Sequence, residues 1–259
     1  MHKPSSLRDY MISILIAAVL LVLFGSYLFV RRGYLFDAPP MVDALYVPNK
    51  VIALAAIAML SLTFLIGPIV RYFDLLDNWL NYRKEIGIVG GLLALLHVIV
   101  SYSFLPLKFP QSEFDMLSWE FSAGIVGTLL LILLFIISFK KAIDCLGGKC
   151  WWFLQRRGLR LVILFVLVHV YVMKGSGWIK WVTQGGSNPM PGLGILVMVF
   201  VIWVVVVRLY ESIFIFKNFG LSTKEISMDA TLKTHGRIFF IGSFLALIAF
   251  YFFIFTRWT

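Results

Sequence analysis

The chain has 259 residues, of which 61% are hydrophobic and only 14% are charged, and its mean hydropathy is +0.93. Soluble globular domains carry about 25% charged residues and about 45–50% apolar ones, so this composition excludes a soluble enzyme. The formal net charge is +10. In a membrane protein, an excess of Lys and Arg reports first on topology. We therefore expect membrane lipid around the chain and no nucleic-acid partner.

Seven charge-free windows predict transmembrane helices, because a helix needs about 20 apolar residues to cross a bilayer. The windows are apolar on all sides, which favours spanning helices over surface helices. The fifth window has only 13 residues between Arg160 and Lys174, so it crosses only if these two side chains extend to the interfaces. In chain order the windows are Tyr10–Val30, Val51–Val70, Ile86–Leu107, Phe121–Phe139, Leu161–Met173, Pro191–Val207 and Ile238–Thr256.

These windows predict an all-α fold, a polytopic transmembrane helix bundle that forms a single domain over residues 1–259. The first window is longer than the apolar region of a signal peptide and no Ala-x-Ala site follows it, so we interpret it as an uncleaved anchor. A nucleotide-binding domain takes roughly 100 residues or more, and the spans leave no room for one. Any chemistry must therefore lie among the helices or on a partner protein.

The distribution of Lys and Arg between the predicted loops orients the bundle, because cytoplasmic loops are enriched in these residues. With the N-terminus in the cytoplasm, seven of the 23 Lys and Arg residues fall on the outer side and the other 16 on the inner side. Seven crossings then place the C-terminus outside. The sequence thus predicts a multi-pass integral membrane protein with a cytoplasmic N-terminus.

Two of the four histidines, His97 and His169, lie inside predicted spans. Ionisable residues inside a span are rare and mark functional sites by default. His97 lies 11 residues after Ile86 and His169 lies 11 residues after Gly158, and these are the predicted inner ends of the third and fifth spans. At 1.5 Å per residue, both imidazoles lie about 16 Å from the inner boundary. The two rings are therefore expected at the same depth.

A level pair of imidazoles in an apolar bundle is the arrangement that a bis-histidine b-type heme requires. Gly90 and Ala94 share a face of the third span with His97 and would leave room for a flat ring, although small residues also permit close helix packing. Phe165 shares a bulky apolar face with His169, a pattern that is equally typical of a core. The alternative is that each histidine bonds a carbonyl or packs between helices. The candidate cofactor-binding residues are His97, His169, Gly90, Ala94 and Phe165, with the two histidines as iron ligands; no catalytic residue is assigned.

At these residues the chain resembles the ferric-reductase-like transmembrane family over about residues 50–175. It is most similar there to the heme-bearing membrane subunit of the bacterial periplasmic methionine-sulfoxide reductase system, and more distantly to the membrane cores of NADPH oxidases and iron reductases. Four segments carry the resemblance in order: Gly67-Pro-Ile-Val-Arg71, Arg83-Lys-Glu-Ile-Gly-Ile88 with Leu96-His97, Ser138-Phe-Lys140 with Leu146-Gly147, and Trp151-x-x-Leu154 with His169.

The resemblance implies a six-helix core, here roughly residues 50–210, heme b and electron transfer across the membrane. His97 and His169 take the positions of axial ligands, and the span at 238–256 exceeds the core. Many relatives have a further histidine where this chain has Gln155, and two-heme members carry an inner ligand where this chain has Arg83 or Lys84. Because none of these side chains replaces an imidazole, we expect one heme, in the outer half.

The donor and the acceptor of the electron are open at this stage. Quinol in the bilayer is one donor; a flavin or other carrier docked on inner cations is another. The positive-inside rule alone also accounts for those cations. The acceptor would be a ferric chelate or an outer-face oxidoreductase, and the resemblance places the protein in the bacterial inner membrane. The inner cations are Lys140, Lys141, Lys149, Arg156, Arg157 and Arg160.

Two other functions compete with electron transfer. The first is a heme-free transporter or channel with the histidines in a proton or metal path, although none of the first five spans has an internal Asp or Glu. The second is a scaffold that kept the helical core and lost its cofactor. Cys145 and Cys150 form no disulfide framework, and we interpret them as reduced thiols in a cytosolic loop.

Overall fold

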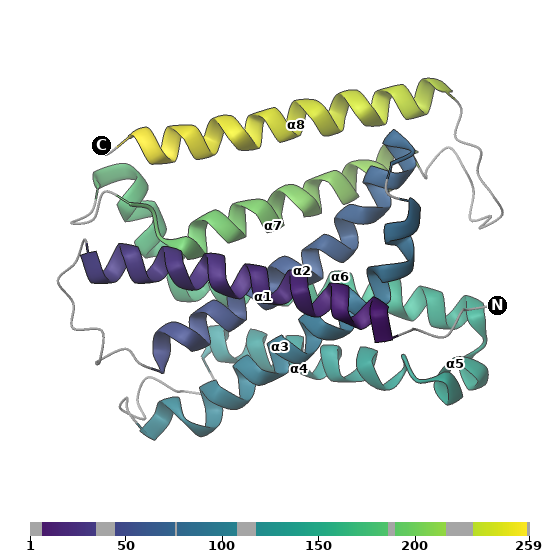
Figure 1. The fold of residues 1–259 in the computed structure, drawn as a ribbon, viewed down its shortest axis with the longest axis horizontal. Coiled ribbons are helices and arrows are strands. Elements are labelled where there is room, and N and C mark those ends of the chain that lie inside the picture. The colour runs from purple at the N-terminus through teal and green to yellow at the C-terminus, as the bar shows by residue number, and fades with distance from the viewer. Residues whose placement is uncertain are drawn as a thin grey trace.

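A computed structural model describes residues 7–34, 45–75, 77–107, 118–185, 190–215 and 230–257. Over these residues the chain is a bundle of helices joined by turns (Figure 1). Helices are the expected outcome in lipid, where each backbone N–H and C=O must find its partner within the same segment. The predicted all-α membrane fold is therefore confirmed.

Within the described ranges, seven helices are long and apolar enough to cross a membrane, as the sequence predicted. The start of α1 and the end of α8 lie at opposite ends of the bundle (Figure 1). An odd number of crossings requires this arrangement. A shorter helix, α5, spans Lys140–Leu146. The seven long helices are α1 Leu7–Phe29, α2 Tyr46–Phe73, α3 Arg83–Ser103, α4 Trp119–Ile136, α6 Gly148–Gln184, α7 Leu193–Tyr210 and α8 Ala230–Thr256.

The fifth crossing differs from its predicted bounds of Leu161–Met173. The helix α6 runs for 37 residues, between Gly147 and Gly185, both of which have positive φ angles. The cations on either side interrupt an apolar window, but Arg and Lys are good helix formers and do not end a helix. Glycine with a positive φ angle does interrupt a helix, and other residues rarely adopt that φ. At 1.5 Å per residue, α6 is about 55 Å long.

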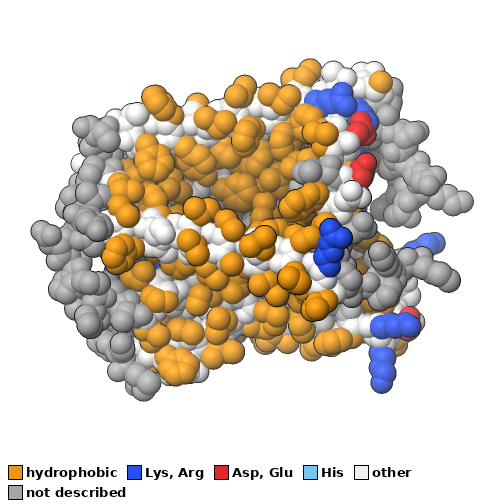
Figure 2. Space-filling model, viewed as in Figure 1, with side chains coloured by type: hydrophobic (Ala, Val, Ile, Leu, Met, Phe, Trp, Pro, Cys, Tyr) orange, Lys and Arg blue, Asp and Glu red, His pale blue; other side chains and the backbone are white. Residues whose placement is uncertain are grey.

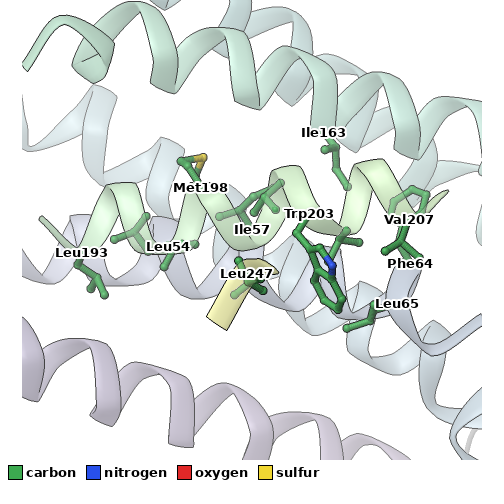
Figure 3. Close-up of a cluster of buried hydrophobic side chains, with 14 of the residues drawn as sticks. Leu54, Ile57, Phe64, Leu65, Ile163, Leu193, Met198, Trp203, Val207 and Leu247 are labelled. Carbon is green, nitrogen blue, oxygen red and sulfur yellow. The ribbon is translucent and has the colours of Figure 1, made fainter. Parts of the chain in front are cut away.

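The helix α2 lies at the centre of the bundle. Its most apolar window is 78% buried and that of α7 is 56% buried, whereas the other five windows are 11–22% buried. Along this contact Leu54 of α2 lies near Leu193 at one end, and Phe64 and Leu65 of α2 lie near Val207 and Trp203 of α7 at the other (Figure 3). The outer helices therefore leave most of their apolar side chains exposed or only half-buried, which suits a lipid environment.

The surface agrees with a membrane-spanning bundle. A broad band of hydrophobic side chains covers the visible face, and the visible Lys and Arg side chains gather mainly at the end where α1 begins (Figure 2). A band of this kind is what the hydrocarbon core requires. The biased distribution of cations matches the asymmetry that the sequence indicated.

Two closely packed helix pairs position the histidines. The helices α2 and α3 form one pair, and α4 and α6 form the other. Glycines allow both close approaches. A Cβ atom on Gly90 of α3 would lie 3.0 Å from Met59 Cβ of α2, and one on Gly127 of α4 would lie 3.4 Å from Phe165 Cβ of α6. In contrast, α3 and α6, which carry the two histidines, have little close backbone contact with each other.

Candidate functional site

His97 lies on α3 and bonds a side chain of α2. Its Nδ1 atom lies 3.0 Å from Oδ1 of Asn49, whose side chain is buried in the first turn of α2. The Nδ2 atom of Asn49 donates in turn to Ser101 Oγ at 2.9 Å. The amide is thus oriented with its oxygen toward the imidazole. An amide oxygen only accepts, so Nδ1 of His97 carries the proton.

His169 lies on α6 and bonds the backbone of α4. Its Nδ1 atom lies 2.5 Å from the carbonyl oxygen of Glu120, in the first turn of α4. The ring packs flat against a glycine, because a Cβ atom on Gly124 would lie only 3.1 Å from His169 Nδ1. A carbonyl oxygen also only accepts. The proton of His169 is therefore on Nδ1, as in His97.

The two imidazoles have the same pattern of hydrogen bonds. They lie close enough to interact electrostatically. In each ring Nδ1 bonds an oxygen, and neither Nε2 has a hydrogen-bond partner among the described residues. A neutral imidazole with Nδ1–H held by an oxygen is the usual form of a metal-ligating histidine. The structure thus brings together the two predicted ligands.

The donor set fits an iron that a macrocycle already holds. Among the described residues, no group of three or more His, Cys, Asp or Glu side chains is placed to hold a metal ion. A bare zinc ion needs three or four protein ligands. Heme iron needs only one or two axial ligands, because the porphyrin supplies the other four. The pair of His97 and His169 matches the second requirement.

The other predicted pocket residues fall into two groups. Ala94 packs with Val162 and Leu131, so it faces the α4–α6 pair, and Phe165 lies on that pair beside Gly127. Gly90 is turned toward α2, where Met59 fills the space in front of it. Helix packing, the alternative that the sequence left open for the small residues, is what this structure shows at Gly90. The contacts of Ala94, Phe165 and Gly90 with a cofactor remain predictions.

Gln155 stands where many relatives have a histidine, and its amide nitrogen makes two hydrogen bonds. Its Nε2 atom donates to the Leu134 carbonyl at 3.0 Å and to Ser138 Oγ at 2.8 Å. One turn earlier, Trp151 Nε1 donates to the Ile137 carbonyl at 2.9 Å. These bonds join the start of α6 to the end of α4. The residues of the predicted connector motif therefore have a structural role here.

The structure also shows a cluster that sequence reasoning missed. Four helices bring five arginines close enough to interact electrostatically at the end where α1 begins. Of the inner cations named in the sequence analysis, only Arg156 and Arg160 belong to this cluster. Its other members come from α2, α3 and α7, and their common depth in the predicted topology was the signal that could have found them. We call these residues the arginine cluster: Arg71, Arg83, Arg156, Arg160 and Arg208.

Protein groups bond much of the arginine cluster. Glu211 is completely buried and forms ion pairs with both Arg71 and Arg208, which ties α7 to α2. The Nε atom of Arg83 donates to the Thr63 carbonyl at 2.9 Å. Such a carboxylate is needed at this place, because buried cations are costly unless they are paired.

Two further sets of residues lie apart from the histidines. Cys145 and Cys150 are free and exposed. An apolar cavity of about 140 Å³ lies between α1, α2 and α3 and is lined in part by Ile86, which is about 16 Å along α3 from His97. Pockets for drug-sized ligands usually measure about 300–1,000 Å³, so this cavity is too small for a porphyrin.

Comparison with known proteins supports the family assignment. Residues 52–159 match the family described as "Ferric reductase like transmembrane component". The chain is also similar to Metalloreductase STEAP2 of Mus musculus and of Homo sapiens, each 26% identical over 163 aligned positions that cover 50% of this chain. The chain spans 33% of the length of each of these relatives. The resemblance to the ferric-reductase-like family is therefore confirmed.

Proposed function

We propose that this protein carries electrons through the membrane on a single b-type heme, with His97 and His169 as the axial ligands. One observation carries the proposal: each imidazole bonds a protein oxygen through Nδ1, and neither Nε2 has a hydrogen-bond partner among the described residues. His97 lies within the segment that matches the ferric-reductase-like family, and His169 lies ten residues after its end. Heme supplies a centre that accepts and releases one electron at a time. The chain would orient that centre, exclude water from it and tune its potential.

The described side chains support one heme rather than two. A second heme, nearer to the arginine cluster, would need ligands at the positions of Arg83 and Gln155. Arg83 bonds Thr63, and Gln155 bonds both Leu134 and Ser138. Neither residue offers an imidazole, and both hold neighbouring helices together. The heme content is therefore expected to be one per chain.

The arginine cluster favours an anionic or acidic electron donor on its side of the membrane. Clustered cations raise the local concentration of anionic ligands. In the predicted orientation this side faces the cytoplasm, so a flavin cofactor or a flavoprotein would approach it there. Quinol in the bilayer is the alternative donor, and dependence of electron entry on ionic strength distinguishes the two, because only docking of a charged donor is screened by salt.

The acceptor that we propose is a ferric chelate or an oxidoreductase on the outer face. The name of the STEAP2 relatives, metalloreductase, favours the chelate. In the orientation proposed here the N-terminus is cytoplasmic and the C-terminus is outside, in a bacterial inner membrane. A heme-free transporter and a scaffold remain as the competing functions, and heme content separates both from the proposal.

The test is an absorption spectrum of the detergent-purified protein, oxidised and then reduced with dithionite, with the heme counted as its pyridine hemochrome. The expected result is a low-spin b-type spectrum with about one heme per chain, lost in His97→Ala and in His169→Ala. The matched control is His235→Ala, because His235 is exposed at the start of α8 and should not affect heme binding. Absence of heme after expression with ample heme would refute the proposal in favour of a transporter or a scaffold.

A further inference from the structure

The two histidines are held by different kinds of hydrogen-bond acceptor. The acceptor for His169 is a backbone carbonyl, that of Glu120, and its position is set by the path of α4. The acceptor for His97 is a side-chain amide, that of Asn49. A side chain can vary between acceptor chemistries while the backbone stays in place. The His97 side of the site is thus the one whose electronic properties depend on a single residue type.

A hydrogen bond to Ser101, as well as the contact with His97, positions the side chain of Asn49. Its side chain is 4% exposed and uses both ends of its amide, Nδ2 to Ser101 Oγ and Oδ1 to His97 Nδ1. Ser101 lies one turn after His97 on α3, and its Oγ atom is also 3.5 Å from His97 Nδ1. Burying an amide is costly unless its hydrogen bonds are made. Ser101 therefore fixes which end of the amide faces the imidazole.

We propose that Asn49 is a positioning residue that fixes the orientation and the electron-donating strength of His97 and so sets the reduction potential of the iron that His97 ligates. The inference rests on the proposed function. An acceptor at Nδ1–H increases the basicity of the ligand, and a more basic ligand favours the ferric state. An amide oxygen is a neutral acceptor of moderate strength, so the potential lies between those that a carboxylate and an apolar residue would give.

The test compares two substitutions that both remove the amide donor to Ser101 and differ in the acceptor that they offer to His97. Asn49→Asp places a stronger acceptor at Nδ1 and should lower the potential, whereas Asn49→Leu removes the acceptor and should raise it. We expect each to change the equilibrium constant for reduction about tenfold, which is about 59 mV for a one-electron couple. Ser101→Ala frees the amide and should shift the potential in the direction of Asn49→Leu, by less. Potentiometric titration of the purified protein measures all three.

A merely structural role for Asn49 would give a different pattern. Loss of packing would move the potential in the same direction in both Asn49 variants, and a result of that kind, or no shift in either, overturns the inference. If Asn49→Leu binds no heme while Asn49→Asp does, the acceptor itself is required and the inference stands. If neither folded variant binds heme, Asn49 serves the fold and the inference is wrong.

Two controls separate this inference from the proposed function. Ser61→Ala changes another buried polar side chain on α2, whose Oγ makes no hydrogen bond, and should leave the potential unchanged. The wild-type spectrum tests the proposed function alone. A wild-type protein that lacks heme contradicts that function, whereas a wild-type protein with heme and with a potential insensitive to Asn49 contradicts only the role of this residue.

Discussion

The helices α3 and α6 carry both histidines and three of the five residues of the arginine cluster, and the two regions differ in what their polar groups do. At the histidines, each ring gives one nitrogen to a protein oxygen and leaves the other unbonded. In the cluster, Glu211 binds two of the arginines, and Arg83 bonds a backbone carbonyl. Each histidine thus has one ring nitrogen without a hydrogen-bond partner among the described residues, whereas the arginine end joins helices.

On both α3 and α6, the same number of residues separates the histidine from the residue nearer to the arginine cluster. Arg83 and His97 are 14 residues apart on α3, and Gln155 and His169 are 14 residues apart on α6. Fourteen residues are close to four helical turns, so each pair lies on one face of its helix, about 21 Å apart. The same spacing thus separates the two levels on both helices. In the proposed function the residue types decide which level would ligate iron, because only one level offers imidazoles.

The largest expected effect comes from breaking the ion pairs of the arginine cluster. Glu211→Gln leaves Arg71 and Arg208 without their buried carboxylate, and we expect a loss of about 3–5 kcal/mol in stability. Thermal unfolding in detergent measures the loss. Asp74→Asn is the control, because Asp74 is exposed and its ion pair with Lys233 should contribute about 0–1 kcal/mol. Equal stability of the two variants would show that the cluster does not tie α7 to α2.

An intermediate effect is expected from crowding His169. In Gly124→Ala the new Cβ atom would lie 3.1 Å from His169 Nδ1, so the ring must shift. Changes next to a metal ligand typically lower metal affinity by about 10–100-fold, and we expect a heme titration to show a loss of that order. Gly25→Ala on α1 is the matched control, since a Cβ atom there meets nothing within 4 Å. Unchanged affinity in Gly124→Ala would contradict the placement of His169.

The smallest effect is expected at Gln155, near the end of the bundle that holds the arginine cluster. Gln155→Leu removes two hydrogen bonds between α6 and the end of α4, which should cost about 1–3 kcal/mol of stability. Because Gln155 is not a ligand in the proposal, the pyridine hemochrome count should stay at one heme per chain. A lower count in folded Gln155→Leu protein would show that this level of the bundle also takes part in heme binding.

The sequence was sufficient for the features that depend on composition and on helical depth. Seven apolar windows predicted seven membrane helices, and all seven are present. Counting residues along two helices predicted that His97 and His169 lie at one depth, and in the structure the two rings are close enough to interact electrostatically. The prediction of the spans succeeds because the bilayer requires a similar apolar length of every crossing helix.

The contacts between helices could not be predicted from the sequence. Asn49 looked like an ordinary residue before the second span, and its bond to His97 crosses 48 positions of the chain. Glu211 follows the predicted sixth span, where nothing indicated that the fold would bury it between two arginines. The length of α6 was misjudged because charge was taken as the end of a span. Rotation of each helix about its axis sets all of these contacts, and hydropathy does not determine that rotation.

The length of α6 has a consequence for how partners meet this protein. The hydrocarbon core of a bilayer is about 30 Å thick, and membrane helices tilt by about 20° on average, so a helix of about 55 Å cannot be enclosed. At least one end of α6 therefore extends beyond the hydrocarbon core. His169 is part of the same continuous helix. A protein that docks on this end of α6 would therefore be joined to the histidine by helix, with no flexible linker between them.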